Sequence, residues 1–207
     1  MAKPTILDIA SIPPDDFPLF FFDSNVWIAV LNQAPGRNSQ TGYQKYLDFW
    51  DALVHVHTRK GDPKLSKRTK YFPKVALPSV ALTETINAQI RISFEASRSS
   101  NPALIPPGEK PSFKKHYRPT PAYQKDLARI LADFQAIEDY IELMDDKFSE
   151  KEIFKEFSQY NPNFDFNDYF YSRLFKGTGV PIVTHDTDFA IFEEITILTS
   201  NKTLLSI

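Results

Sequence analysis

The 207-residue chain contains no cysteine and only 6 glycines. Without cysteine it has no disulfide scaffold, no zinc-finger or iron–sulfur ligands and no thiol nucleophile. The few glycines, beside 16 prolines, exclude collagen-like repeats and flexible glycine-rich linkers. The most apolar stretch, residues 17–31, is interrupted by Asp23 and is too short to span a membrane. Residues 1–16 lack the apolar run of a signal peptide, so we expect a cytoplasmic protein with no membrane association.

The overall amino-acid composition is that of a globular protein. Hydrophobic residues make up 42% of the chain and charged residues 24%, and the 18 phenylalanines argue against disorder. The length fits one ordinary domain. We therefore predict a single domain over residues 1–207, with a proline-rich insertion at about residues 99–121.

Short apolar runs alternate along the chain with segments of helical periodicity. The apolar runs predict buried strands at residues 19–22, 75–77, 180–183 and 196–199. Periodicity and capping residues predict helices at residues 25–32, 41–59, 79–97, 123–148, 150–160 and 165–176. This alternation indicates an α/β fold: a three-layer α/β/α domain with a central, mostly parallel sheet and extra helical and loop insertions.

Two of the predicted strands lead directly into carboxylates. Asp23 follows the first strand, and Thr184-His185-Asp186-Thr187-Asp188 follows the third. Because ligands bind open parallel sheets at the carboxyl ends of strands, we expect these acids to converge. Each aspartate alone is also typical of a turn or cap, but a shared cation explains why both would be buried. We expect His185, between the candidate ligands, to be a solvated loop residue.

Two further carboxylates are placed to join this group. Glu84 lies in the first turns of a predicted helix and flanks its apolar stripe, with Asn87 and Arg91 among its helical neighbours. Asp168 lies in the first turn of the 165–176 helix. The alternatives are a solvated ion pair for Glu84 and, for Asp168, a capping role at the positive end of the helix dipole.

The charge is unevenly distributed, although the formal net charge is only −2. Residues 59–74 carry seven basic residues against one acid, and residues 110–125 carry five basic residues with aromatics between them. By contrast, residues 133–168 carry eleven acids and three bases. Such polarity is typical of a phosphate-binding surface beside an acidic site, although either basic run could be a solvated loop. The candidate phosphate-backbone contacts are Lys64, Lys67, Arg68, Lys70, Lys114, Lys115 and Arg118.

The acidic motifs occur in an order that resembles a known family. They are Phe21–Val26, Ser79–Glu84, Phe166–Phe170 and Val183–Phe189. The arrangement resembles the PIN-domain family, and within it the VapC-like bacterial toxins, over about residues 19–198. The chain departs from compact toxins in a longer spacing between its first two acids and in Tyr169-Phe170-Tyr171, which replaces the small residues usual there.

The resemblance implies a site and a cofactor. The family's metal-binding and catalytic acids fall on Asp23, Glu84, Asp168 and Asp186, with Asp188 as an accessory ligand. The implied orienting residues of the site are Ser24, Asn25 and Thr184. Oxygen-only ligands select a hard cation, Mg²⁺ or Mn²⁺.

We therefore expect a metal-dependent endoribonuclease that hydrolyses RNA phosphodiester bonds. The RNA preference comes from the resemblance, since the residues alone indicate only a phosphodiester. The resemblance also implies a toxin with an antitoxin partner, and a homodimer. The sequence has no glycine-rich phosphate-binding motif and no evident Ser–His–Asp set. It therefore does not indicate a nucleotide-cofactor enzyme or a serine hydrolase. The alternatives are a non-catalytic PIN-like module that binds RNA or protein, and a metal-dependent DNA nuclease or phosphoesterase.

Overall fold

The computed structural model describes residues 3–32, 42–147 and 165–207. Its centre is a six-stranded sheet in the order β1-β6-β5-β2-β3-β4, and every strand pairing is parallel. The strands are β1 (Thr5–Asp8), β2 (Leu19–Phe22), β3 (Lys74–Pro78), β4 (Ile141–Met144), β5 (Ile182–Val183) and β6 (Thr196–Thr199). The sheet confirms the predicted α/β fold class, whereas the prediction of a single domain over residues 1–207 stays a prediction.

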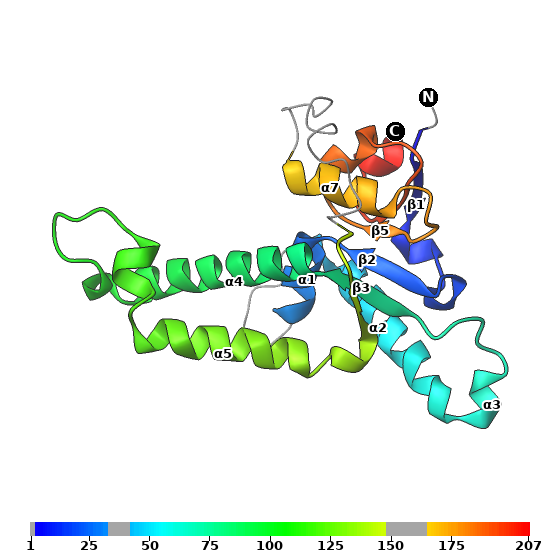
Figure 1. Ribbon diagram of the computed structural model, residues 1–207, viewed down its shortest axis with the longest axis horizontal. Coiled ribbons are helices and arrows are strands. Elements are labelled where there is room, and N and C mark those ends of the chain that lie inside the picture. Colours follow the sequence, from blue (N-terminus) through cyan, green and yellow to red (C-terminus); the bar gives the residue numbers. More distant parts are fainter. Residues whose placement is uncertain (1–2, 33–41, 148–164) are drawn as a thin grey trace.

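Helices connect the strands and cover the sheet (Figure 1). They are α1 (Ser24–Leu31), α2 (Gln44–Thr58), α3 (Pro63–Ser66), α4 (Ser79–Ser100), α5 (Pro121–Gln135) and α7 (Phe166–Phe175). Each begins and ends within a few residues of its predicted bounds, except α3, which was not predicted, and α5. Gly177, which follows α7 with a φ of +68°, supplies the left-handed conformation that commonly terminates a helix.

The three phenylalanines of β2 show why helices lie on both faces of the sheet. Successive side chains of a strand point to opposite faces. The Phe20 and Phe22 rings contact Phe49 of α2, whereas the Phe21 ring stacks on Phe175 of α7 with centroids 4.6 Å apart. All three phenylalanines are fully buried. A continuous apolar run is therefore what this central strand requires.

Helices α4 and α5 pack side by side as a hairpin that projects from the sheet (Figure 1). The proline-rich segment forms the hairpin's tip, with a short π-helix at Phe113–Tyr117. Tyr117 is fully buried there, and its ring lies within 5.8 Å, centroid to centroid, of Phe94, Phe113 and Tyr123. The predicted insertion is thus partly helical and has a small aromatic core of its own.

One prediction about the secondary structure was wrong, and one strand was missed. The helix predicted over residues 123–148 ends at Gln135, and the chain then enters the edge strand β4, which pairs with β3. Strand β1, which pairs with β6, was not predicted. The helix predicted over residues 150–160 lies outside the described residues. None of the helices in the described part of the chain is both long and apolar enough to cross a membrane.

Candidate metal centre

The candidate site lies where the strand order of the sheet reverses. Strand β2 is flanked by β3 on one side and β5 on the other, and Phe22 pairs with Val183. Asp23 and Thr184, the next residues along the two strands, therefore lie next to each other. The Asp23 backbone N–H donates to the Val183 carbonyl oxygen at 3.0 Å. Such a reversal opens a crevice at the carboxyl ends of the two strands, the usual ligand site of open α/β sheets.

A chain of hydrogen bonds continues from Asp23 into the loop after β5. The Thr184 hydroxyl donates to Asp23 Oδ2 at 2.9 Å and accepts from the Asp186 backbone N–H at 2.9 Å. Asp186 Oδ1 in turn accepts from the backbone N–H of Asp188 at 2.9 Å. One side chain, Thr184, thus couples the carboxylate after β2 to the turn that carries the other two.

Three carboxylates from this turn and from α7 come together. Asp168, Asp186 and Asp188 can each offer one oxygen, and the three oxygens lie within 4.8 Å of one another. Asp168 is buried, Asp186 is half-buried and Asp188 is exposed, so the group extends from the interior to the surface. The sequence separates Asp168 from the other two, and the packing of α7 against the sheet places it beside them.

Glu84 joins the group from α4 through two hydroxyl groups. The Ser24 hydroxyl lies between two carboxylates, 3.3 Å from Asp23 Oδ1 and 3.1 Å from Glu84 Oε1. The Tyr171 hydroxyl donates to the other oxygen, Glu84 Oε2, at 2.7 Å. Both oxygens of Glu84 are therefore held in place by side chains from α1 and α7.

The electrostatics of the site are those of crowded and partly desolvated acids. Burial raises the pKa of Asp23 to about 6. The hydrogen bond from Thr184 lowers this pKa, and the negative charge of Glu84 raises it further. Burial also raises the pKa of Asp168 to about 8, and the charges of Asp23 and Asp186 add to the effect. Burial and the Glu84 hydrogen bond raise the pKa of Tyr171, which therefore stays protonated as a donor.

The donor set suits a hard divalent cation. Asp23 is only 3% exposed and Asp168 only 8%, yet no lysine or arginine of the described residues forms an ion pair with either carboxylate. Burying such charges is unfavourable unless a cation compensates them. All the available ligand atoms are oxygens, the preference of Mg²⁺ and Mn²⁺. The acidic group can therefore bind a metal ion. Asp168, Asp186 and Asp188 are the three acids whose oxygens lie close enough together to share one.

The three predicted orienting residues occupy different surroundings. Ser24 and Thr184 are buried and hydrogen-bonded to site carboxylates as described above. Asn25 is exposed on the first turn of α1, and its side chain has no hydrogen bond to any other described residue. The orienting role of all three residues stays a prediction.

Sequence reasoning missed several residues around the acids. Tyr171 was noted only as a departure from the family pattern, although its position three residues after Asp168 puts both on one helix face. His185, predicted to be solvated, is half-buried: its Nδ1 lies 3.1 Å from the Tyr46 hydroxyl and its ring lies 5.0 Å from that of Tyr43. The Tyr46 hydroxyl also donates to the Thr184 carbonyl oxygen at 2.9 Å, so this network supports the loop that follows β5.

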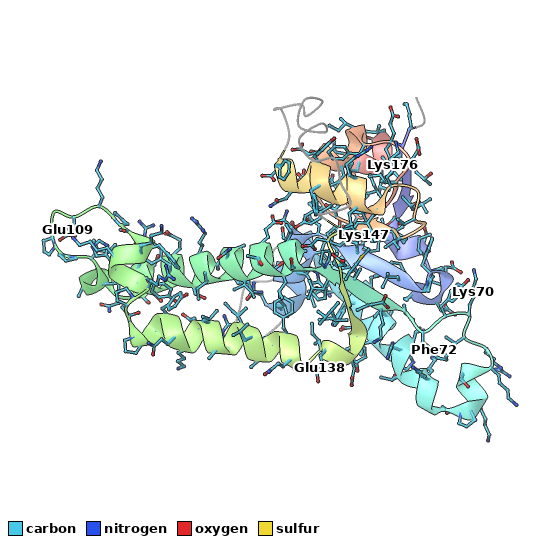
Figure 2. The ribbon with its side chains drawn as sticks, in the orientation of Figure 1. Lys70, Phe72, Glu109, Glu138, Lys147 and Lys176 are labelled. Carbon is cyan, nitrogen blue, oxygen red and sulfur yellow. The ribbon has the colours of Figure 1, made fainter. Side chains whose placement is uncertain are left out.

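The two predicted RNA-binding segments lie at opposite ends of the molecule. Figure 1 shows α3 at one end of the long axis and the hairpin tip at the other, with α7 and β5 between them, and Figure 2 marks the same ends by Lys70 and Glu109.

At the α3 end, Lys64, Lys67 and Arg68 line a hollow of about 560 Å³. Lys70 pairs with Asp16 at 3.7 Å, and at the tip Lys115 pairs with Glu109 at 2.5 Å. Lys114 and Arg118 are exposed at the tip. The structure does not bring these segments into the acidic site.

Comparisons with known proteins add little to this geometry. No protein-family model matches the chain. No curated protein matches it either. Among solved structures, the chain is similar to one in the crystal structure of VapBC2 from Rickettsia felis bound to a DNA fragment from their promoter. The identity is 10% and the TM-score 0.44, over 86% of this chain and 96% of that one. A likeness this weak says nothing about chemistry.

Proposed function

We propose that the chain is a metal-dependent endoribonuclease that hydrolyses RNA phosphodiester bonds. The observation that supports this most strongly is the convergence of acids from four segments at the point where the strand order reverses. The proposed catalytic and metal-binding residues are Asp23, Glu84, Asp168 and Asp186, with Asp188 as a further ligand. Two of them are buried carboxylates without a cationic side-chain partner among the described residues.

The chain's own residues would hold the acids in position. When bound, a Mg²⁺ or Mn²⁺ ion would bind a phosphoryl oxygen of the substrate, lower the pKa of a bound water and stabilise the charge on the leaving oxygen. Thr184 donates to one oxygen of Asp23 and Tyr171 to one oxygen of Glu84, and the one proton of the Ser24 hydroxyl serves the remaining oxygens of both carboxylates. With the carboxylates already oriented, less ordering is required when a cation and a phosphodiester bind.

Substrate and partners are proposed from the resemblance. The preference for RNA, a toxin role with an antitoxin, and a homodimer are family properties. The basic segments are proposed to bind the RNA backbone, and the three cations around the α3 hollow support that role most directly. Light scattering of the purified chain, alone and after co-expression with a neighbouring gene product, tests both partner proposals.

The test of the activity is cleavage of mixed structured and single-stranded RNA in Mg²⁺, Mn²⁺ or EDTA. We expect cleavage that requires the metal and that Asp23→Asn reduces by about 100-fold or more, because the variant keeps the shape and removes a ligand charge. The matched control is Asp51→Asn, which changes an exposed aspartate on α2 and should cleave like the wild type.

Three outcomes would contradict the proposal. Equal cleavage by the wild type and Asp23→Asn would show a contaminating nuclease. Cleavage of DNA or of small phosphoesters in preference to RNA would indicate the alternative phosphoesterase. RNA binding without cleavage in any metal would indicate a non-catalytic module.

A further inference from the structure

A groove of about 520 Å³ opens beside the acidic site and follows α4. Glu84 lines it together with α4 residues on either side, and Asn167 of α7 lines it too. The volume falls within the range of about 300–1,000 Å³ typical of ligand pockets. Since Glu84 belongs both to the groove and to the group of acids, a molecule in the groove would directly adjoin the site.

Three polar side chains of the groove, those of Asn87, Arg91 and Asn167, have no partner among the described residues, whereas Glu84 is held by Ser24 and Tyr171. Arg91 is exposed, and none of the carboxylates in the described ranges pairs with it. Two other arginines of the hairpin differ: Arg98 pairs with Glu95 and Arg129 with Asp133. The amides of Asn87 and Asn167 likewise make no hydrogen bond to a described residue. Within the described part of the chain, one unpaired guanidinium and two unpaired amides thus line a groove that leads to the acids.

The spacing of Glu84 and Arg91 suits a chain of phosphates. Seven residues are almost two helical turns, so the two side chains lie on one face of α4, about 10 Å apart along its axis. On one strand of duplex DNA successive charges are about 3.4 Å apart along the helix axis, so a separation of about 10 Å is enough to span more than one phosphate. A phosphate held near the acids would therefore leave a phosphate of a flanking nucleotide within reach of the guanidinium, which binds phosphate in a bidentate manner.

We infer that this groove holds the RNA strand on one side of the scissile bond and that Arg91 binds a backbone phosphate there. The inference rests on the proposed nuclease function and specifies, in addition, where the RNA strand runs on the protein surface. The acids repel a polyanion, and Arg91 is the cation among the residues that line the groove. Arg91 thus offsets that repulsion directly beside the site, which the basic segments at the ends of the molecule do not reach.

The test is binding of a short fluorescent single-stranded RNA, measured by anisotropy in EDTA over a range of salt concentrations. We expect Arg91→Gln to weaken binding about tenfold, because a charge-assisted hydrogen bond to phosphate is lost. The slope of log affinity against log salt should fall by about 0.7, the value for one phosphate contact with a single strand. Arg98→Gln is the matched control, since Arg98 lies two turns further along α4 and is already paired; it should change binding by less than about twofold.

Three outcomes overturn the inference. Equal effects of the two substitutions would mean general attraction by the helix, and no effect of either would remove Arg91 from the interface. Single-stranded DNA bound as tightly as RNA, with the same dependence on Arg91, would overturn the assignment of the strand as RNA.

The result can be separated from the proposed function. Mn²⁺ binding measured by calorimetry should be the same in the wild type and Arg91→Gln. In cleavage, the substitution should raise KM and leave kcat nearly unchanged, because Arg91 contacts the strand away from the reacting atoms. If the wild type fails to cleave but its RNA binding still requires Arg91, the nuclease proposal is wrong and the RNA-binding role of the groove is supported. If the wild type cleaves and Arg91→Gln binds RNA normally, the RNA-binding role of the groove is wrong and the nuclease proposal is supported.

Discussion

At the scale of single residues, the buried acids should make the metal-free protein sensitive to pH. The pKa values of about 6 for Asp23 and about 8 for Asp168 lie above the aspartate value of ~3.9 in an unfolded chain. Between these limits the folded state binds more protons than the unfolded state, so the free energy of unfolding falls as pH rises. A bound divalent cation compensates the same charges and should oppose this loss.

The first prediction therefore concerns Asp168→Asn without divalent cations. We expect the substitution to raise Tm by a few degrees at about pH 8, where Asp168 is fully ionised in the unfolded chain but only about half ionised in the folded protein, and to change Tm little at about pH 4. Thermal unfolding in EDTA across this range is the measurement, with exposed Asp51→Asn as the control. A Tm of the wild type that stays constant from about pH 4 to about pH 8 would contradict the burial argument, as would destabilisation by Asp168→Asn at high pH.

The second prediction concerns Tyr171, whose hydroxyl holds Glu84. Tyr171→Phe keeps the ring, which packs 4.7 Å from that of Phe21, and removes only the donor. We expect kcat to fall about tenfold with RNA affinity unchanged, because the carboxylate loses its orientation and not its charge. Tyr140→Phe, which changes a half-buried tyrosine against Trp50, is the matched control. Full activity of Tyr171→Phe would show that Glu84 needs no such support.

At the scale of elements, the sequence predicted the elements that position the site better than those at the edges of the sheet. Asp23 and Asp186 could be placed because one apolar strand ends immediately before Asp23 and another ends three residues before Asp186. By contrast, the apolar stripe after Tyr123 continues in helical register through Met144, yet residues 141–144 form β4. The open edge of β3 offers backbone partners there, and such tertiary pairing outweighs local periodicity.

The contacts that complete the site also escaped prediction, because they join distant parts of the chain. The hydrogen bond from Tyr171 to Glu84 spans 87 residues and that from Thr184 to Asp23 spans 161. Nothing in a local pattern indicates which hydroxyl faces which carboxylate. Arg91 was visible as a helical neighbour of Glu84, but the groove depends on how α7 packs against α4.

The third prediction concerns the capping of α5 at the hairpin tip. The Thr120 side chain accepts from the Tyr123 backbone N–H at 3.2 Å, and Pro121 occupies the first helical position. Thr120→Ala should destabilise the protein by about 1 kcal/mol, which corresponds to a Tm about 2–4 °C lower in a chain of this size. Thr203→Ala is the control, because Thr203 also precedes a short helix but its side chain makes no capping bond. Equal Tm changes in the two variants would mean that the Thr120 cap contributes nothing.

At the scale of the whole molecule, the separation of the charges implies a dependence on the length of the RNA. Helix α7 and strand β5 at the acidic site lie between α3 and the hairpin tip (Figure 1). The groove beside Glu84, at about 520 Å³, can hold only a few nucleotides. A short strand that fills the groove would not extend to α3, whereas a long RNA can contact both. The contribution of the α3 end to binding should therefore appear only when the RNA is long enough to span that distance.

The fourth prediction is that the triple variant Lys64→Gln, Lys67→Gln, Arg68→Gln binds a short single strand like the wild type but binds long RNA more weakly. These three cations line one hollow, so removing them should lower the salt slope for long RNA by about 2, the sum of three phosphate contacts at about 0.7 each. Affinity measured against both RNA lengths at several salt concentrations gives the comparison. The same substitution at Lys114, Lys115 and Arg118 tests the hairpin tip, where Lys115 is already paired with Glu109 and a smaller change is expected. If the α3 variant weakens both lengths equally, the short strand already reaches α3, and the path along α4 is not the one the RNA takes.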